Sequence, residues 1–167
     1  MVRVAAVLET SFWIAAYRAE VAANCLDLFE IIVPRAVERE ILAVQPSAPR
    51  REYPYATLFR HLRVQMSDPS DPAPAPLTIF GAGEAEAIPL AQHLGAALLI
   101  NERRAAIYAS NLAISIVTVP AVVVVLCDQQ IISDRAARTK LALIEPITAP
   151  EIITDARRAL DAIETPR

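Results

Sequence analysis

Acidic residues follow two apolar runs of this 167-residue chain at the point where each run ends. Glu9 comes directly after the run Val2–Leu8. Glu102 comes after the run Ala97–Ile100, with Asn101 between them. Parallel sheets bind ligands at the carboxyl ends of their strands, so carboxylates at these two positions are candidates for a functional site.

Helical spacing adds two further glutamates to this set. Glu84 opens a stripe that recurs at intervals of three and four residues, which indicates the buried face of a helix. The members of this stripe are Glu84, Ala87, Ala91 and Leu94. Glu86 would point roughly the opposite way, but Pro89 lies inside the same helix and leaves the choice between the two acids open. In the helix that follows Pro34, Glu40 flanks the apolar stripe more closely than Glu38 does.

Carboxylates gathered in one place would suit a divalent cation. Buried carboxylates are costly to desolvate and raise one another's pKa, and a cation removes that cost. Mg²⁺ and Mn²⁺ prefer carboxylate and water ligands. The only histidines, His61 and His93, and the two distant cysteines, Cys25 and Cys127, do not form a zinc motif. The chemistry indicated is activation of water and stabilisation of charge during phosphodiester hydrolysis.

Strands and helices alternate along the chain that must position these acids. We expect strands at Val2–Leu8, Ile31–Val33, Ala97–Ile100 and Ile114–Val119, with a further candidate at Leu62–Met66. We expect helices from Thr10 or Ser11, from Pro34 to before Pro46 and Pro49, at Tyr55–Leu62, up to Gly95, from Asn101, and from the last strand onward. The alternation predicts an α/β fold, a three-layer α/β/α sandwich with a central, mainly parallel sheet.

Length and composition favour one domain spanning residues 1–167. A chain of 167 residues with 54% hydrophobic content can bury a single core. Within it we expect an irregular, proline-rich insertion around 46–77 and a helical C-terminal tail around 148–167. The net charge of −3 means that any binding of nucleic acid must depend on local basic groups.

The sequence also favours a cytoplasmic protein without a membrane segment. The two cysteines lack paired spacing, which fits a reducing compartment, and the N-terminus lacks a secretory signal. The apolar run Ala113–Cys127 is shorter than a membrane span and is interrupted by Ser115, Thr118 and Pro120. A buried strand that leads into a buried helix accounts for this run.

Four motifs, in order along the chain, resemble those of the PIN-domain nucleases. They are V-L-E-T-S, V-P-R-A-V-E-R-E-I, G-A-G-E-A-E-A-I-P-L-A-Q-H-L-G and L-L-I-N-E-R-R-A. The resemblance covers most of the region from Val2 to about Ile132. It is strongest to the small prokaryotic PIN-like proteins that carry a G-x-G-E-x-E-A-I helix.

The resemblance implies a metal-dependent endoribonuclease with a PIN-like fold. The catalytic acids that it implies are Glu9, Glu40, Glu84 and Glu102, with Glu9, Glu84 and Glu102 as ligands of Mg²⁺ or Mn²⁺. The residues that it implies in substrate binding are Thr10, Ser11, Asn101, Arg103 and Arg104. It further implies an RNA substrate, the role of toxin in a toxin–antitoxin pair with a cognate antitoxin, and a homodimer.

Departures from the family pattern keep a second hypothesis open. The chain has Glu where the family usually has Asp at the first, third and fourth acidic positions, and each extra methylene moves a carboxylate. Val119 and Pro120 stand where relatives often have a Gly-Thr pair. The alternative is a degenerate PIN-like domain without catalysis, acting as an RNA- or protein-binding module. Individually, Glu40 could be a solvated helix acid, and Glu102 a helix cap.

Overall fold

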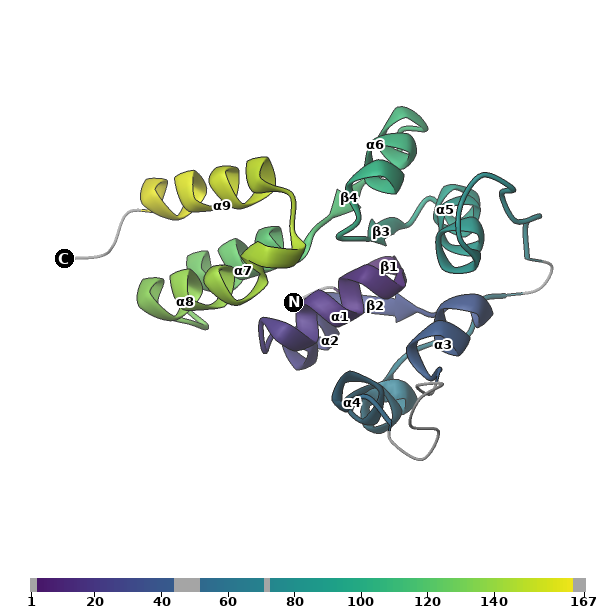
Figure 1. The fold of residues 1–167 in the computed structure, drawn as a ribbon, viewed down its shortest axis with the longest axis horizontal. Coiled ribbons are helices and arrows are strands. Elements are labelled where there is room, and N and C mark those ends of the chain that lie inside the picture. The colour runs from purple at the N-terminus through teal and green to yellow at the C-terminus, as the bar shows by residue number, and fades with distance from the viewer. Residues whose placement is uncertain (1–2, 44–51, 71–72, 164–167) are drawn as a thin grey trace.

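A parallel sheet of four strands lies at the centre of the fold (Figure 1). The computed structural model of the chain describes residues 3–43, 52–70 and 73–163. The strands are β1 (Val4–Leu8), β2 (Phe29–Ile32), β3 (Ala97–Leu99) and β4 (Ile116–Val117), in the order β2-β1-β3-β4. All three neighbouring pairs are parallel, so the strands end at one edge of the sheet. Helices flank this sheet, and the predicted α/β class is confirmed.

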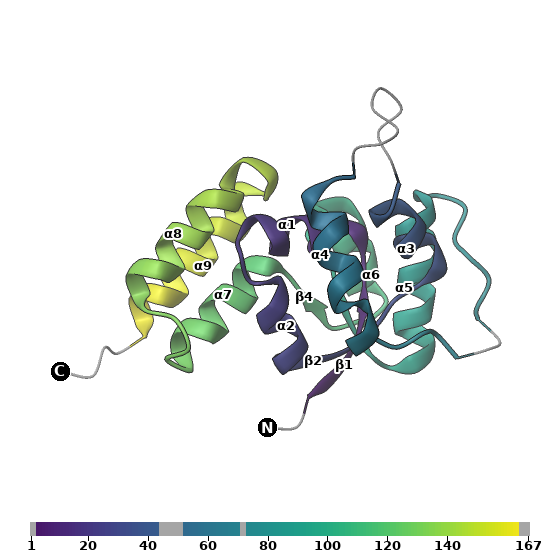
Figure 2. The same cartoon turned by 90° about the horizontal axis from the view of Figure 1, so that it is seen from below.

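Most of the described chain outside the sheet is helical. The α-helices are α1 (Thr10–Arg18), α2 (Ala22–Leu28), α3 (Arg35–Ile41), α4 (Pro54–Leu62), α5 (Ala82–Leu94), α6 (Arg103–Asn111), α7 (Val119–Asp128), α8 (Asp134–Ile144) and α9 (Pro150–Ala162). Two short 3₁₀ helices cover Arg63–Gln65 and Glu145–Ile147. Helices α7, α8 and α9 gather at one end of the molecule, and α3, α4 and α5 at the other (Figures 1 and 2). Within the described ranges, no helix is long and apolar enough to cross a membrane.

Two predicted strands differ from those observed. The strand at Leu62–Met66 is wrong, because this segment forms a 3₁₀ helix in which Val64 is 87% exposed. Directly after this 3₁₀ helix, Ser67 forms an isolated parallel bridge with Ile32 of β2. The strand predicted at Ile114–Val119 is confined to Ile116–Val117, because Thr118 already caps α7. The predicted positions Val2, Pro46 and Pro49 lie outside the described residues.

Aromatic packing fixes α1 against α4. The rings of Trp13 and Phe59 are almost fully buried and meet edge to face, with 5.3 Å between their centroids. The indole N–H of Trp13 donates to the backbone carbonyl of Tyr55 at 2.9 Å, so its polar group is satisfied within the core. This contact holds α1 in place, and the first residues of α1 reach the edge where the strands end.

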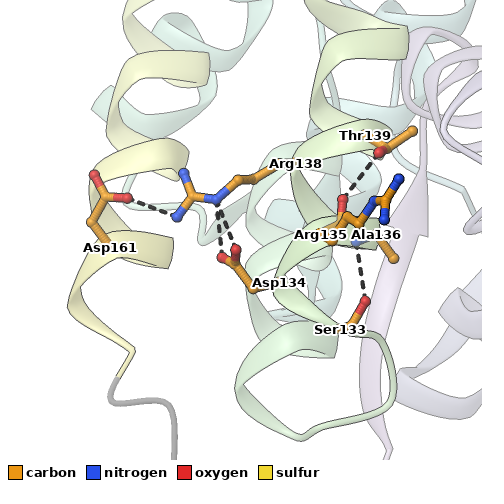
Figure 3. Close-up of polar contacts among 7 residues, drawn as sticks. All are labelled: Ser133, Asp134, Arg135, Ala136, Arg138, Thr139 and Asp161. Carbon is orange, nitrogen blue, oxygen red and sulfur yellow. Dashed lines mark hydrogen bonds and ion pairs between the residues drawn. The ribbon is translucent and has the colours of Figure 1, made fainter.

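Polar contacts join the C-terminal helices to one another and to α1. The guanidinium of Arg138 on α8 donates to Asp134 on the same helix and, at 2.8 Å, to Asp161 on α9 (Figure 3). The ammonium of Lys140 donates to the carbonyls of Ala19 and Glu20 at the end of α1, at 3.1 and 3.2 Å. The Arg138 pairs are exposed and contribute little stability, whereas Lys140 satisfies carbonyls that α1 leaves free.

Helix α5 continues through Pro89 because another segment replaces the missing hydrogen bond. A proline inside a helix cannot donate to the carbonyl four residues earlier, which here belongs to Ala85. The backbone N–H of Leu77 donates to that carbonyl at 3.0 Å. Pro89 therefore provides an attachment point for the proline-rich segment that precedes α5.

Two positions with positive φ give a matched test of the backbone. Gly95 ends α5 at φ +60°, and a β-carbon added there would meet no atom within 4 Å, so substitution costs only conformational strain. Ala113 has the same φ of 60° after α6, where glycine would relieve that strain. Gly95→Ala should lower the free energy of unfolding by about 1 kcal/mol, and Ala113→Gly should raise it by up to about the same amount. Urea denaturation measures both, and shifts of the same sign would contradict the assignment.

Candidate functional site

Glu9 is buried where β1 ends and α1 begins. Its backbone N–H donates to the carbonyl of Leu99 at 3.0 Å, so the residue still belongs to the β1–β3 register. Its side chain is only 3% exposed and caps α1 by accepting from the backbone N–H of Ser11 at 2.8 Å. The hydroxyl of Ser11 donates to the same Glu9 oxygen, Oε2. One residue of α1 therefore fixes the orientation of the buried carboxylate.

Glu40 reaches the same region from α3 and joins three helices. Its Oε2 accepts from the hydroxyl of Thr10 on α1, and its Oε1 accepts from the backbone N–H of Gly83 on α5 at 2.8 Å. A β-carbon on Gly83 would overlap the Glu40 carboxylate and lie 3.1 Å from Thr10 Oγ1. Glycine is therefore required at this position for Glu40 to approach the backbone.

Glu84 lies in the first turn of α5 and completes a group of three carboxylates. Its Oε2 lies 2.8 Å from where a β-carbon on Gly81 would stand, so the side chain folds back over the start of its helix. Glu86 faces elsewhere, because its carboxylate accepts from the backbone N–H of Ala36 at 2.8 Å and pairs with Arg39 at 3.6 Å. Of the two acids that the sequence left open, Glu84 is the one whose charge acts on Glu9.

Burial and neighbouring charges change the protonation of Glu9. Burial raises the pKa of Glu9 to about 7 from its ordinary 4.5, against the lowering effect of the two Ser11 hydrogen bonds. The charges of Glu84 and Glu40 make smaller upward contributions to this pKa, and the value of about 7 includes them. Within the described part of the chain, no lysine or arginine forms an ion pair with any of these three acids. The site therefore joins one buried carboxylate, Glu9, to two half-buried ones that no described cation neutralises.

Glu102 follows β3 as expected, but its carboxylate faces its own helix. Its two oxygens accept from the backbone N–H groups of Arg104 and Ala105, at 3.0 and 2.7 Å. Glu102 is the N-cap of α6 and is not among the charges that raise the pKa of Glu9. Of the four predicted acids, Glu40 and Glu84 lie near enough for their charges to act on Glu9, and Glu102 caps a helix.

Asn101 links the end of β3 to the C-terminal part of the chain. Its backbone N–H donates to the Ser11 hydroxyl at 3.0 Å, next to Glu9. Its side-chain amide donates to Thr148 Oγ1 at 3.0 Å and to the carbonyl of Ile147 at 3.4 Å. Its Oδ1 is buried and accepts no hydrogen bond from the described residues. The contribution of Thr148 was missed in the sequence, because no local signal connects residues that lie 47 positions apart.

The two arginines beside Glu102 have different surroundings. Arg103 pairs with Glu151 at the start of α9, with 2.5 Å between Nε and Oε1. The guanidinium of Arg104 lies over the ring of Phe80, with 5.6 Å from its carbon to the ring centroid. Phe80 itself was not predicted as a site residue, because it follows a proline-rich stretch and belongs to no helical stripe. The structure places it beside the start of α5.

The available oxygens fit a hard divalent cation held partly by water. No group of three or more His, Cys, Asp or Glu side chains in the described ranges is arranged to enclose a metal ion. However, Glu9 Oε1 and both oxygens of Glu84 accept no hydrogen bond from the described residues. Mg²⁺ is commonly held by one or two carboxylates together with waters and substrate phosphates. Glu9 and Glu84 supply donor atoms of this kind.

Comparison with known proteins gives the family. A family model described as a PIN domain matches residues 6–161, nearly the whole chain. Among solved structures, the chain is similar to a PilT N-terminus domain protein from the hyperthermophilic archaeon Sulfolobus solfataricus P2. The sequence identity is 12% and the TM-score 0.43, over 68% of this chain and 86% of that one. The comparison with curated proteins finds no match. From the extent of the family match, the chain belongs to the PIN-domain family.

Proposed function

We propose that this PIN domain is a metal-dependent endoribonuclease that hydrolyses RNA at the carboxylates of Glu9, Glu40 and Glu84. PIN domains are generally nucleases and typically use divalent metals. The observation that carries the proposal is the burial of Glu9, 3% exposed, beside two further carboxylates that no described lysine or arginine neutralises. Such a group must bind either a proton or a cation, because an unpaired buried charge is costly.

Each carboxylate has a distinct part in this proposal. Glu9 and Glu84 would hold Mg²⁺ or Mn²⁺, since each has an oxygen that accepts no hydrogen bond from the described residues. Glu40 has both oxygens engaged by Thr10 and Gly83, so it supplies fixed negative charge and positions the start of α5. The bound cation would supply a Lewis acid that activates water and offsets charge on the phosphate. Ser11 keeps the Glu9 carboxylate oriented toward the site.

Glu102 has a lesser role than the motif implies. Its oxygens cap α6, and it could bind a cation only by releasing the backbone N–H groups of Arg104 and Ala105. A helix cap contributes about 1 kcal/mol to stability, so the main expected effect of Glu102→Ala is a loss of folding stability of that size. We therefore propose Glu102 as an acid at the edge of the site and not as one of its first ligands.

The finer parts of the proposal rest on the motif resemblance. They are RNA as the substrate, contacts to it from Thr10, Ser11, Asn101, Arg103 and Arg104, and a cytoplasmic toxin that forms a homodimer and is neutralised by a cognate antitoxin. Arginines beside the carboxylates support a phosphate substrate, because phosphate contacts position a strand without reading its bases. Both cysteines are free, in keeping with a reducing compartment.

A second candidate function is a binding module without catalysis. The cap made by Glu102 and the lack of a three-ligand group in the described ranges favour it. The two candidates differ in one property, since the module requires no cation at Glu9 and Glu84. RNA cleavage that is lost when the charge of Glu84 is removed would support the nuclease over the binding module.

The pKa of Glu9 predicts how stability changes with pH in the absence of divalent cations. Between pH 4.5 and about 7 the folded protein holds a proton on Glu9 that the unfolded chain has lost. Stability should therefore fall as pH rises through this window, by about 3 kcal/mol from this residue, and level off above it. Urea midpoints measured in EDTA across this range test the prediction. In Glu9→Gln the loss of stability over this pH range should be smaller by that amount. The same loss in Glu9→Gln as in the parent would contradict a raised pKa for Glu9.

Glu84 and Glu86 provide a matched pair for the catalytic proposal. Glu84→Gln removes a cation ligand while keeping the size of the side chain, and should slow Mn²⁺-dependent cleavage of mixed-sequence, single-stranded RNA by at least about 10- to 100-fold. Glu86→Gln removes the same charge two residues along α5, where it contacts Ala36 and Arg39, and should leave the cleavage rate near that of the parent. Equal rates for both variants, or cleavage that persists in EDTA, would contradict the proposal.

A further inference from the structure

A small aromatic surface lies beside Glu84, and of its residues only Arg104 has a role in the function proposed above. It consists of Ile79, Phe80, Arg104 and Tyr108, and we call it the Phe80 shelf. The rings of Phe80 and Tyr108 meet edge to face, with 5.1 Å between centroids, and the Arg104 guanidinium lies over the Phe80 ring. Ile79 is 54% exposed, so the shelf presents apolar surface to solvent.

The position of the shelf follows from the starts of two helices. Phe80 directly precedes Gly81, and the Glu84 carboxylate folds back over Gly81. Arg104 and Tyr108 lie four residues apart, so they share one face of α6, the helix that begins beside the end of β3. In Figure 1 both α5 and α6 lie next to β3. The shelf therefore extends from the carboxylates toward α6.

Arg104 has the properties of a ligand-binding cation. Its side chain has no carboxylate partner in the described part of the chain, whereas the neighbouring Arg103 is paired with Glu151. Contact with an aromatic ring restricts a guanidinium without using its hydrogen-bond donors. Phe80 thus holds a positive charge at the start of α6 and leaves the N–H groups of Arg104 free for an anion.

We infer that the Phe80 shelf binds one nucleotide of single-stranded RNA next to the phosphate that is cleaved. Arg104 binds a phosphate of that nucleotide, and Phe80 and Ile79 contact its unpaired base. Phe80 also acts as a positioning residue for Arg104. Aromatic and arginine side chains commonly stack with unpaired bases, and arginine binds phosphate through its N–H groups. The inference rests on the proposed function and names the residues that hold one nucleotide of its substrate.

A preference for single-stranded RNA follows from the chemistry of the surface. A base within a duplex is already paired and stacked, so it cannot lie on an aromatic side chain of the protein. The shelf should therefore favour single strands over a duplex of the same sequence. A cation–π pair that serves only to stabilise the fold would give no such preference and no effect on RNA affinity.

Fluorescence anisotropy with a labelled, short single-stranded RNA of mixed sequence tests the inference. Ca²⁺ replaces Mn²⁺ in the binding buffer, and a gel confirms that the RNA stays intact. Phe80→Leu keeps apolar volume but removes the ring, and Arg104→Gln removes the charge. Each should raise Kd by about 5- to 10-fold, and the duplex should bind the parent protein by a similar factor more weakly. Arg135→Gln, which removes one charge from α8, is the control and should bind like the parent.

The salt dependence of binding distinguishes phosphate contact from a structural effect. Loss of one phosphate contact should reduce the slope of log K against log salt by about 0.7 for Arg104→Gln, with a smaller change for Phe80→Leu. Urea midpoints confirm that each variant is folded. Binding equal to that of Arg135→Gln, equal affinity for duplex and single strand, or no binding by the parent would overturn the shelf.

Cleavage measured on the same parent preparation separates this inference from the proposed function. A parent that cleaves RNA in Mn²⁺ while both variants bind normally overturns the shelf alone. A parent whose binding depends on Phe80 and Arg104 but that never cleaves RNA supports the shelf and overturns the nuclease. The two failures therefore give different results.

Discussion

The buried charge of Glu9 is the constraint around which the rest of the site is arranged. A carboxylate at the end of a central strand loses its hydration, and burial is the main reason that its pKa rises to about 7. Ser11 offsets part of this cost with two hydrogen bonds, whereas Glu84 and Glu40 add to it. A fold that needed only stability would place an apolar residue here. The arrangement is explained if the site takes up a cation.

The topology of the chain brings these acids together. Strands β1 and β3 are neighbours in the sheet, which places Glu9 beside the turn at Asn101. Helices α3 and α5 pack against one another, and Glu40 and Gly83 meet where they do. Leu77 donates to the Ala85 carbonyl that Pro89 leaves without a helical donor, which ties the segment before α5 to the helix that carries Glu84. The geometry of the site therefore depends on long-range contacts as much as on the strands.

Local patterns predicted those parts of the structure that local forces determine. The alternation of apolar runs predicted the parallel sheet. The helical stripe favoured Glu84 over Glu86, but Pro89 left that choice open. The strand at Leu62–Met66 was wrong because a short apolar run does not show whether a sheet edge is within reach. The cap formed by Glu102 was one of two alternatives, and only side-chain geometry decides between them. Gly83, Thr148 and Phe80 depend on partners distant in sequence, which the residue pattern does not contain.

The most direct test of the cation site is the number of protons released when Mn²⁺ binds. At pH 7 Glu9 is about half protonated, so a cation that binds there must displace about half a proton. Calorimetric titration with Mn²⁺ in two buffers of different ionisation enthalpy measures this number. The account predicts binding with release of about half a proton at pH 7, falling toward zero at pH 9 and in Glu9→Gln. Binding without proton release at pH 7, or no binding at all, would contradict it.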